Sequence, residues 1–366
     1  MANVFGDLQG TSLNYRNPTL IGIAASAALT ILVIVGSRNL ENFDSALFGY
    51  TIASIVAFGA IFFRYAIWLQ RPSTRAYFLR GLQLFFQKGR MGRNTGVAAK
   101  TLATNLIEQR FIFKRDRLRW LMHLLIMWGC ILSALVTFPL VFGWVSFRLE
   151  GDMGYRTYVF GFPLNLMQGR SLIAWVTFHA LDFTAIMVIA GCAIAIHRRL
   201  RDRGAIALQT FLLDFVPHML LISVSVSGLM LTASSLWFRG YMYSFIALSH
   251  QALVIMTLFF LPFGKLFHII QRPASIGVEL YQNRSEEMEQ AVCPRCCTHF
   301  VGQMWLDDLK GVVDKLGFDY RLQNGHTLQD YCPRCKRVAR GLAYAGIPKT
   351  SEGVFYGTRA DGSSRE

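Results

Sequence analysis

Two histidines, eighteen positions apart, interrupt the apolar stretch FIALSHQALVIMTLFFLPFGKLFHII at residues 245–270. These residues are His250 and His268. Ionisable side chains are costly inside a membrane and usually have a function there. In one continuous helix, which turns about 100° per residue, both imidazoles would lie on the same face, about 27 Å apart along the axis. The spacing therefore predicts one histidine in each leaflet and favours two stacked metal centres on this helix.

Two more histidines lie at matching depths in other predicted spans. His179 is level with His250 near the outer side, and His123 is roughly level with His268 near the cytoplasmic side. Haem b takes axial imidazoles from different helices, and apolar bundles commonly hold it between facing side chains. We therefore expect His179 and His250 to bind an outer haem b. The expected ligands of an inner haem b are His123 and His268.

The inner ligand has an alternative. His197 follows His179 by eighteen positions and could replace His123 on the same reasoning. It opens the basic run HRRLR, however, where a polar side chain at the level of the lipid headgroups is also expected. Any one of these histidines could equally hydrogen-bond a neighbouring helix, so the haem assignment depends on the pattern of the whole set.

A further polar group lies in the fifth predicted span. His218 follows Asp214 by four positions, so the two side chains share one helix face. An acid and a histidine inside a span are candidates for proton transfer or for contact with a quinone, and Lys265 is a third candidate. A structural hydrogen bond beside Pro217 is an equal alternative for His218, which is also, like His197, an alternative haem ligand.

The polar tail carries two CxxC pairs separated by 35 residues. The four candidate ligands are Cys293, Cys296, Cys332 and Cys335. Four thiolates in this pattern suit a tetrahedral structural zinc or a rubredoxin-like mononuclear iron. Rubredoxin knuckles usually continue into glycine, whereas Cys297 and Lys336 follow here, which favours zinc. The remaining cysteines, Cys130 and Cys192, stand inside apolar spans and are expected to be small buried hydrophobes.

Composition and charge indicate a polytopic membrane protein. Of the 366 residues 53% are hydrophobic, and the net charge is +15. Six stretches have the roughly 20 apolar residues that a membrane helix needs. They are residues 19–36, 47–69, 119–145, 171–197, 208–235 and 243–270. The basic residues are concentrated between these spans, which excludes nucleic acid as the expected partner.

The basic links also predict the topology. Between Arg64 and Arg119 there are 13 Lys/Arg against Glu108 and Asp116, and the link HRRLRDRG is also basic. By the positive-inside rule these links and the tail are cytoplasmic, and with six spans so is the N-terminus. The expected location is the inner (cytoplasmic) membrane of the cell. Residues 76–87, AYFLRGLQLFFQ, could form an amphipathic helix on the membrane surface.

These patterns predict five regions. The fold class is all-α, with about six transmembrane helices that include a four-helix haem-binding bundle, followed by a small cytoplasmic zinc-ribbon or rubredoxin-like module. The regions are two N-terminal membrane helices at 1–70, a basic surface segment at 71–116, the di-haem bundle at 117–272, a metal-binding module at 285–350 and a flexible tail at 351–366.

The sixth span carries a family resemblance. SHQALVIMTLFFLPFGKLFHII is similar to the last membrane helix of the gamma-type cytochrome b subunits of respiratory nitrate reductases, whose relatives include membrane subunits of heterodisulfide-reductase-like complexes. The shared features are the histidine spacing and the ending Pro262, Phe263, Lys265 and His268. His123, in RDRLRWLMHLLIMWG, matches a family ligand near the cytoplasmic start of an earlier helix. The nitrate reductase branch has a second histidine ten positions later, where Ser133 stands here.

The resemblance implies two b haems and electron transfer between the quinone pool and a cytoplasmic iron–sulfur subunit. The expected function is thus the membrane-anchoring, quinone-reactive electron-transfer subunit of a respiratory oxidoreductase complex, in contact with lipid and a cytoplasmic catalytic partner. The alternative is a membrane transporter or metal-handling protein with a zinc-binding cytoplasmic tail. Against the alternative, the histidines form two layers, whereas transporter sites gather near the midplane.

Overall fold

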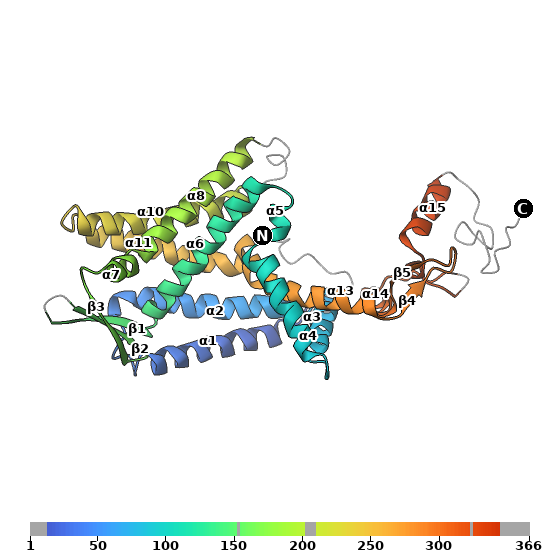
Figure 1. Cartoon of the computed structure of the whole chain (residues 1–366), viewed down its shortest axis with the longest axis horizontal. Helices are drawn as coiled ribbons and strands as arrows, with labels where there is room; N and C mark the ends of the chain where they lie inside the picture. Colours follow the sequence, from blue (N-terminus) through green and yellow to red (C-terminus); the bar gives the residue numbers. More distant parts are fainter. Residues whose placement is uncertain (1–12, 152–153, 202–209, 323–324, 345–366) are drawn as a thin grey trace, which may run out of the picture. The chain divides into compact units, whose positions relative to one another are not determined.

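The computed structural model describes residues 13–151, 154–201, 210–322 and 325–344 (Figure 1). The chain forms two compact units, which we call the helical unit (residues 15–66 and 103–272) and the tail unit (residues 1–14, 67–102 and 273–366). Part of the predicted metal-binding module (345–350) and the whole predicted flexible tail (351–366) lie outside the described residues.

The helical unit consists of long helices joined by short elements. Its helices are α1 (Arg16–Gly36), η1 (Ser45–Leu47), α2 (Phe48–Trp68), η2 (Leu102–Ile107), α5 (Arg110–Phe113), α6 (Arg117–Val141), α7 (Leu172–Phe178), α8 (Ala180–Arg201), η3 (Phe211–Phe215), α10 (Val216–Leu236), α11 (Tyr243–Phe263), η4 (Lys265–Phe267), α12 (His268–Gln271) and η5 (Arg272–Ala274). Its strands are β1 (Val145–Glu150), β2 (Gly154–Val159) and β3 (Phe162–Gln168).

Six helical segments in the described part of the chain are long and apolar enough to cross a membrane. They are Arg16–Gly36, Ser45–Trp68, Arg117–Val141, Ala180–Arg201, Phe211–Leu236 and Tyr243–Phe263. The prediction of six membrane helices is confirmed, and the architecture is that of a multi-pass membrane protein.

The predicted single helix over residues 243–270 is wrong beyond Phe263. Gly264 adopts an extended backbone (φ −92°, ψ −171°), and the chain continues as one 3-10 turn before α12 begins at His268. Glycine is a poor helix former, and an extended residue ends the ladder of backbone hydrogen bonds. His250 and His268 therefore stand on separate helical segments, and the one-face argument does not apply to them.

The predicted span at 171–197 is also divided. Ser171 caps the short helix α7 by accepting a hydrogen bond from the Ala174 backbone N–H. His179 ends α7 with non-helical dihedral angles (φ −101°, ψ 9°), and α8 begins at Ala180. His179 consequently lies at a joint in the chain, just before the membrane helix.

A three-stranded antiparallel sheet joins α6 to α7, which the all-α prediction missed. Figure 1 shows it at the end of the helical unit where α6 ends. Phe160 (φ 49°) and Gly161 (φ 76°) form the two-residue turn between β2 and β3, and two positive φ angles suit the twist of a tight hairpin. Arg156 pairs with Glu150 across β1 and β2.

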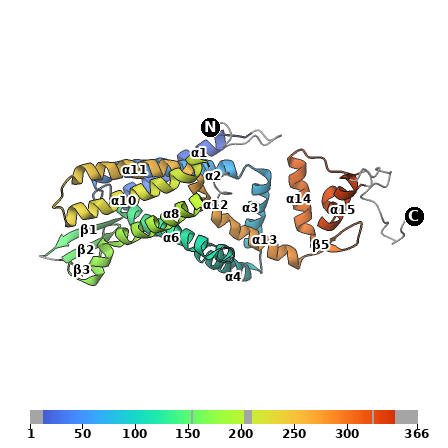
Figure 2. The same cartoon turned by 90° about the horizontal axis from the view of Figure 1, so that it is seen from above.

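Small and hydroxyl residues hold the membrane helices together, as expected in lipid. Helix α6 packs along α8, α8 along α10, and α10 along α11 (Figures 1 and 2). A Cβ atom added to Gly129 of α6 would lie 2.6 Å from Val188 of α8. Ser133 Oγ donates to Thr184 Oγ1 at 2.7 Å across the same pair of helices. Ser133, which stands where the nitrate reductase branch has a histidine, thus packs against α8.

The tail unit joins residues that are far apart in the sequence. Its elements are α3 (Pro72–Phe85), α4 (Met91–Thr101), α13 (Ser275–Glu287), β4 (Gln290–Val292), β5 (His299–Gly302), α14 (Gln303–Lys315), η6 (Leu328–Asp330) and α15 (Pro333–Tyr344). Helix α3 packs on α13, where a Cβ atom on Gly81 would lie 2.8 Å from Gly277 Cα.

A polar cluster fixes α3 to α14. Arg80 contacts Asp308 through two hydrogen bonds, Nε to Oδ2 at 2.9 Å and Nη2 to Oδ1 at 2.6 Å. Tyr281 also donates to Asp308, and Tyr77 accepts from Trp305 at 2.9 Å. Burial opposes ionisation of Asp308, but the Arg80 and Tyr281 hydrogen bonds outweigh it and lower the pKa of this carboxyl.

Candidate functional site

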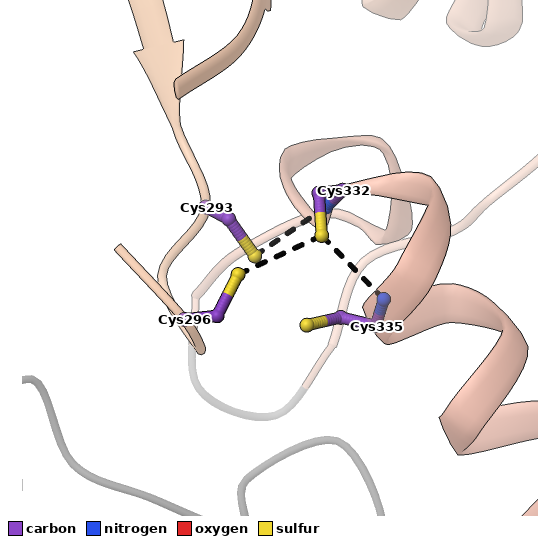
Figure 3. Close-up of side chains that lie close together, drawn as sticks. All are labelled: Cys293, Cys296, Cys332 and Cys335. Atoms are coloured by element: carbon purple, nitrogen blue, oxygen red, sulfur yellow. Dashed lines mark hydrogen bonds between the residues drawn. The ribbon is translucent and has the colours of Figure 1, made fainter. Parts of the chain in front are cut away.

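The four predicted thiol ligands come together in the tail unit (Figure 3). Cys293 and Cys296 follow β4, and Cys332 and Cys335 lie at the start of α15. Their sulfur atoms all lie within 4.8 Å of one another, and the Cys296 and Cys332 sulfurs are 3.6 Å apart. A tetrahedral ion with metal–sulfur bonds of about 2.3 Å separates its ligands by about 3.8 Å. The four cysteines can therefore bind a metal such as zinc or iron.

Backbone amides and a hydroxyl support the thiol cluster. The Cys332 N–H donates to Cys293 Sγ at 3.4 Å, and the Cys335 N–H donates to Cys332 Sγ at 3.5 Å. The hydrogen bond between Thr298 and Cys296 lowers the pKa of that thiol to about 6, whereas burial raises the pKa of Cys335 to about 12. Metal binding displaces these protons, because the thiolate is the ligand.

Cys297, the residue after the first CxxC pair, has an unusual backbone conformation. Cys297 stands where a rubredoxin knuckle usually has glycine, and its backbone is left-handed (φ 53°). That is the conformation glycine adopts without steric cost. The second knuckle differs, because Lys336 lies within α15 and needs no such backbone. At the first CxxC pair the backbone therefore has the conformation that a glycine would adopt, although the residue is Cys297.

The two predicted inner histidines lie close together. The ring centroids of His123 on α6 and His268 on α12 are 6.3 Å apart, with an interplanar angle of 60°. The Nδ1 atom of His268 lies 2.6 Å from the backbone oxygen of Lys265. A carbonyl oxygen only accepts, so Nδ1 carries the proton and Nε2 keeps a free lone pair.

A buried glutamine orients the other inner histidine. Gln109 Oε1 lies 2.7 Å from His123 Nδ1, so its amide oxygen accepts the Nδ1 proton and leaves the His123 Nε2 lone pair free. Gln109 is 3% exposed and has a left-handed backbone (φ 54°), a strained conformation for this residue type. Its amide nitrogen contacts the Met127 sulfur. The sequence pattern gave no sign of Gln109, because its role depends on a turn and on a contact fourteen positions away.

The predicted outer histidines are not joined by a contact. His250 on α11 bonds Ser227 of α10, with Nδ1 2.8 Å from Ser227 Oγ. His179 stacks on Trp175, and its Nδ1 lies 3.0 Å from the Trp175 backbone oxygen. Among the described residues no hydrogen bond or ring contact links His179 with His250. Both imidazoles nevertheless have Nδ1 beside an oxygen acceptor, as the inner pair has.

The three quinone or proton candidates gather where α8 ends and α10 begins. Asp214 is 6% exposed, and its Oδ1 lies 2.6 Å from Lys265 Nζ and 2.9 Å from Arg199 Nη1. His218 Nδ1 contacts the Asp214 backbone oxygen at 2.7 Å instead of the carboxylate. Asp214 therefore joins three helical segments, α8, η3 and η4, and Arg199 is a member of this cluster that the sequence did not single out.

Among the described residues, His197, the alternative inner ligand, makes no ring contact with His268. His197 is exposed on the last turns of α8 and makes no hydrogen bond or ring contact with another described residue. This position agrees with a side chain at the level of the lipid headgroups.

The chain matches no family model, and searches of curated proteins and of solved structures find no similar protein. The cytochrome b resemblance thus remains an expectation from the sequence. The structure itself defines a class: a multi-pass membrane protein with six apolar helices and a four-cysteine site that can bind a metal.

Proposed function

We propose that this chain is the di-haem b subunit of a membrane redox complex, which passes electrons between quinone and a cytoplasmic iron–sulfur partner. The single observation that carries the proposal is the close pair His123 and His268. Both belong to the inner ends of membrane helices or to the turns that follow them.

The spacing of this pair suits a shared metal ion. Imidazole nitrogens bind first-row metals at about 2.0 Å, and each nitrogen lies about 1.1 Å from its ring centroid, so two opposed ligands give centroids about 6.2 Å apart. The observed separation is 6.3 Å. The rings need not be coplanar, because each can rotate about its own bond to the metal.

The surroundings of the pair also suit ligation. Metal-binding histidines almost always donate their second ring N–H to an oxygen, which fixes the tautomer and raises the basicity of the ligand. Gln109 and the Lys265 carbonyl supply these acceptors. His123 and His268 would both be ligands of the haem, and the haem would supply electron transfer there, with substrate chemistry left to other sites.

The remaining sites have supporting roles in this proposal. His218 and Lys265 would exchange protons with quinone near the inner haem, and the Asp214 carboxylate, which two cations hold in its charged form, would position Lys265. His179 and His250 are the proposed outer ligands on the basis of depth. The four-cysteine site would fix the tail as a docking module for the soluble partner.

An absorption spectrum of the purified full chain tests the proposal. We expect sharp b-type bands in the reduced-minus-oxidised difference spectrum and about two haems per chain. A preparation that retains the tail metal but shows no such bands would contradict haem binding. Zinc bound in excess of the four-cysteine site, again without haem, would favour the metal-handling alternative.

A further inference from the structure

Helix α3 has two opposite faces of different character. One face carries Tyr77, Arg80 and Gly81, which pack on α13 and α14. The opposite face carries Leu79 and Leu82 and is followed by Phe86, the residue that caps the helix. These three side chains are 44%, 42% and 64% exposed. At about 100° per residue they fall within about 60° of one another, so they form one apolar stripe.

Cations without acidic neighbours in the sequence flank the stripe. Residues 71–107 contain seven Lys/Arg and no Asp or Glu. Three of these seven cations pair with acids that are distant in the sequence: Arg80 with Asp308, and Arg90 and Arg93 with Glu287.

Two exposed cations stand at the ends of the stripe itself. Arg75 lies on the same face one turn before Leu79, and Lys88 follows Phe86 by two positions. Neither forms an ion pair with another described residue. An apolar stripe bordered by exposed cations matches the interface of an anionic bilayer, where apolar groups reach the acyl boundary and cations meet phosphate.

We propose that this face of α3, the stripe Leu79, Leu82 and Phe86 with Arg75 and Lys88, inserts into the anionic lipid interface of the membrane that α2 crosses. Chain connectivity supports this occupant. Helix α2 ends at Trp68 and α3 begins at Pro72, so the start of α3 lies within about 14 Å of the end of a membrane helix. The inference is independent of haem binding.

Photocrosslinking of the full chain in proteoliposomes tests the proposal. The photoreactive residue p-benzoylphenylalanine replaces Leu82 or Phe86, and the matched control replaces Thr95, an exposed polar residue of α4 in the same unit. With vesicles containing labelled phosphatidylglycerol we expect lipid adducts at positions 82 and 86 and at least tenfold fewer at 95. Adducts to protein at 82 and 86, or no adducts, would overturn the proposal.

The role of the cations is tested separately. In the Leu82-substituted chain, Arg75→Gln or Lys88→Gln is expected to lower the lipid adduct yield by up to about fivefold on phosphatidylglycerol vesicles. On phosphatidylcholine vesicles the yield should not change. An equal loss on both lipids would contradict an anionic partner. Unchanged gel filtration and unchanged tail metal content establish that each variant is folded.

Discussion

The same reasoning predicts the inner and the outer histidine pairs, yet only the inner pair makes a ring contact among the described residues. The ring centroids of His123 and His268 are 6.3 Å apart, whereas His179 and His250 contact different neighbours. Two side chains at the same depth in the membrane can still lie on helices that are far apart. Whether two side chains at one depth meet depends on which helices are adjacent and on how each chain segment ends.

Local breaks in the chain account for the difference. Gly264 lets α12 take its own direction, so that His268 reaches His123 although it no longer continues α11. At the outer side the break at His179 places this residue before α8, beside Trp175. In addition, a hydrogen bond between Ser133 and Thr184 joins α6 to α8. The inner pair is therefore the better supported half of the proposal.

The largest expected effect is the loss of the inner haem. His123→Ala should remove about half of the haem per chain and the corresponding spectral component, because one axial ligand is lost. His197→Ala is the matched control and should leave both haems, since His197 is exposed and makes no hydrogen bond or ring contact with another described residue. Pyridine haemochrome assays measure the content. Full haem in His123→Ala and half in His197→Ala would reverse the assignment.

The outer pair is tested next, with haem content and the spectrum again as the measurement. If both outer ligands are correct, His250→Ala and His179→Ala each remove the second haem and retain the inner component. His250→Ala is the firmer expectation, because the contact with Ser227 Oγ already fixes the orientation of the His250 ring. Loss of haem in His250→Ala alone would show that another residue replaces His179.

A smaller effect is expected at Gln109. Removing its hydrogen bond in Gln109→Leu makes His123 a weaker donor, which destabilises the oxidised haem. A bond of about 1 kcal/mol corresponds to a rise of about 40 mV in the midpoint potential of the inner haem. Gln109→Glu supplies a charged acceptor and should lower that potential instead. Shifts of the same sign in both variants would indicate a merely structural role.

The smallest effect is expected at the outer counterpart of Gln109. Ser227→Ala removes the hydroxyl oxygen that lies beside His250 Nδ1, and a hydroxyl oxygen carries less negative charge than an amide oxygen. We expect a rise of at most about 20 mV, confined to the outer haem. Redox titration resolves the two components. A shift of the inner component would mean that the histidines do not serve separate centres.

Features set by local composition were predictable from the sequence. The six apolar helices follow from length and hydrophobicity, and the thiol cluster follows from two CxxC pairs. Features that depend on single backbone angles or on long-range contacts were not predictable from the sequence. Phe160 and Gly161 turn a link into a hairpin, and Gly264 ends a helix that its apolar residues would continue. Gln109 acquires its role only when a strained turn brings it to His123.

The contact between Arg80 and Asp308 has a consequence for the order of events during synthesis. The two residues are 228 positions apart, which a ribosome translates in roughly 10–45 s at 5–20 residues per second. During that interval α3 exists without α13 and α14, while the chain between them is still entering the membrane. Helix α3 is made early and must wait for α14, so the contact between Arg80 and Asp308 forms only after the six apolar helices of the described residues have been made.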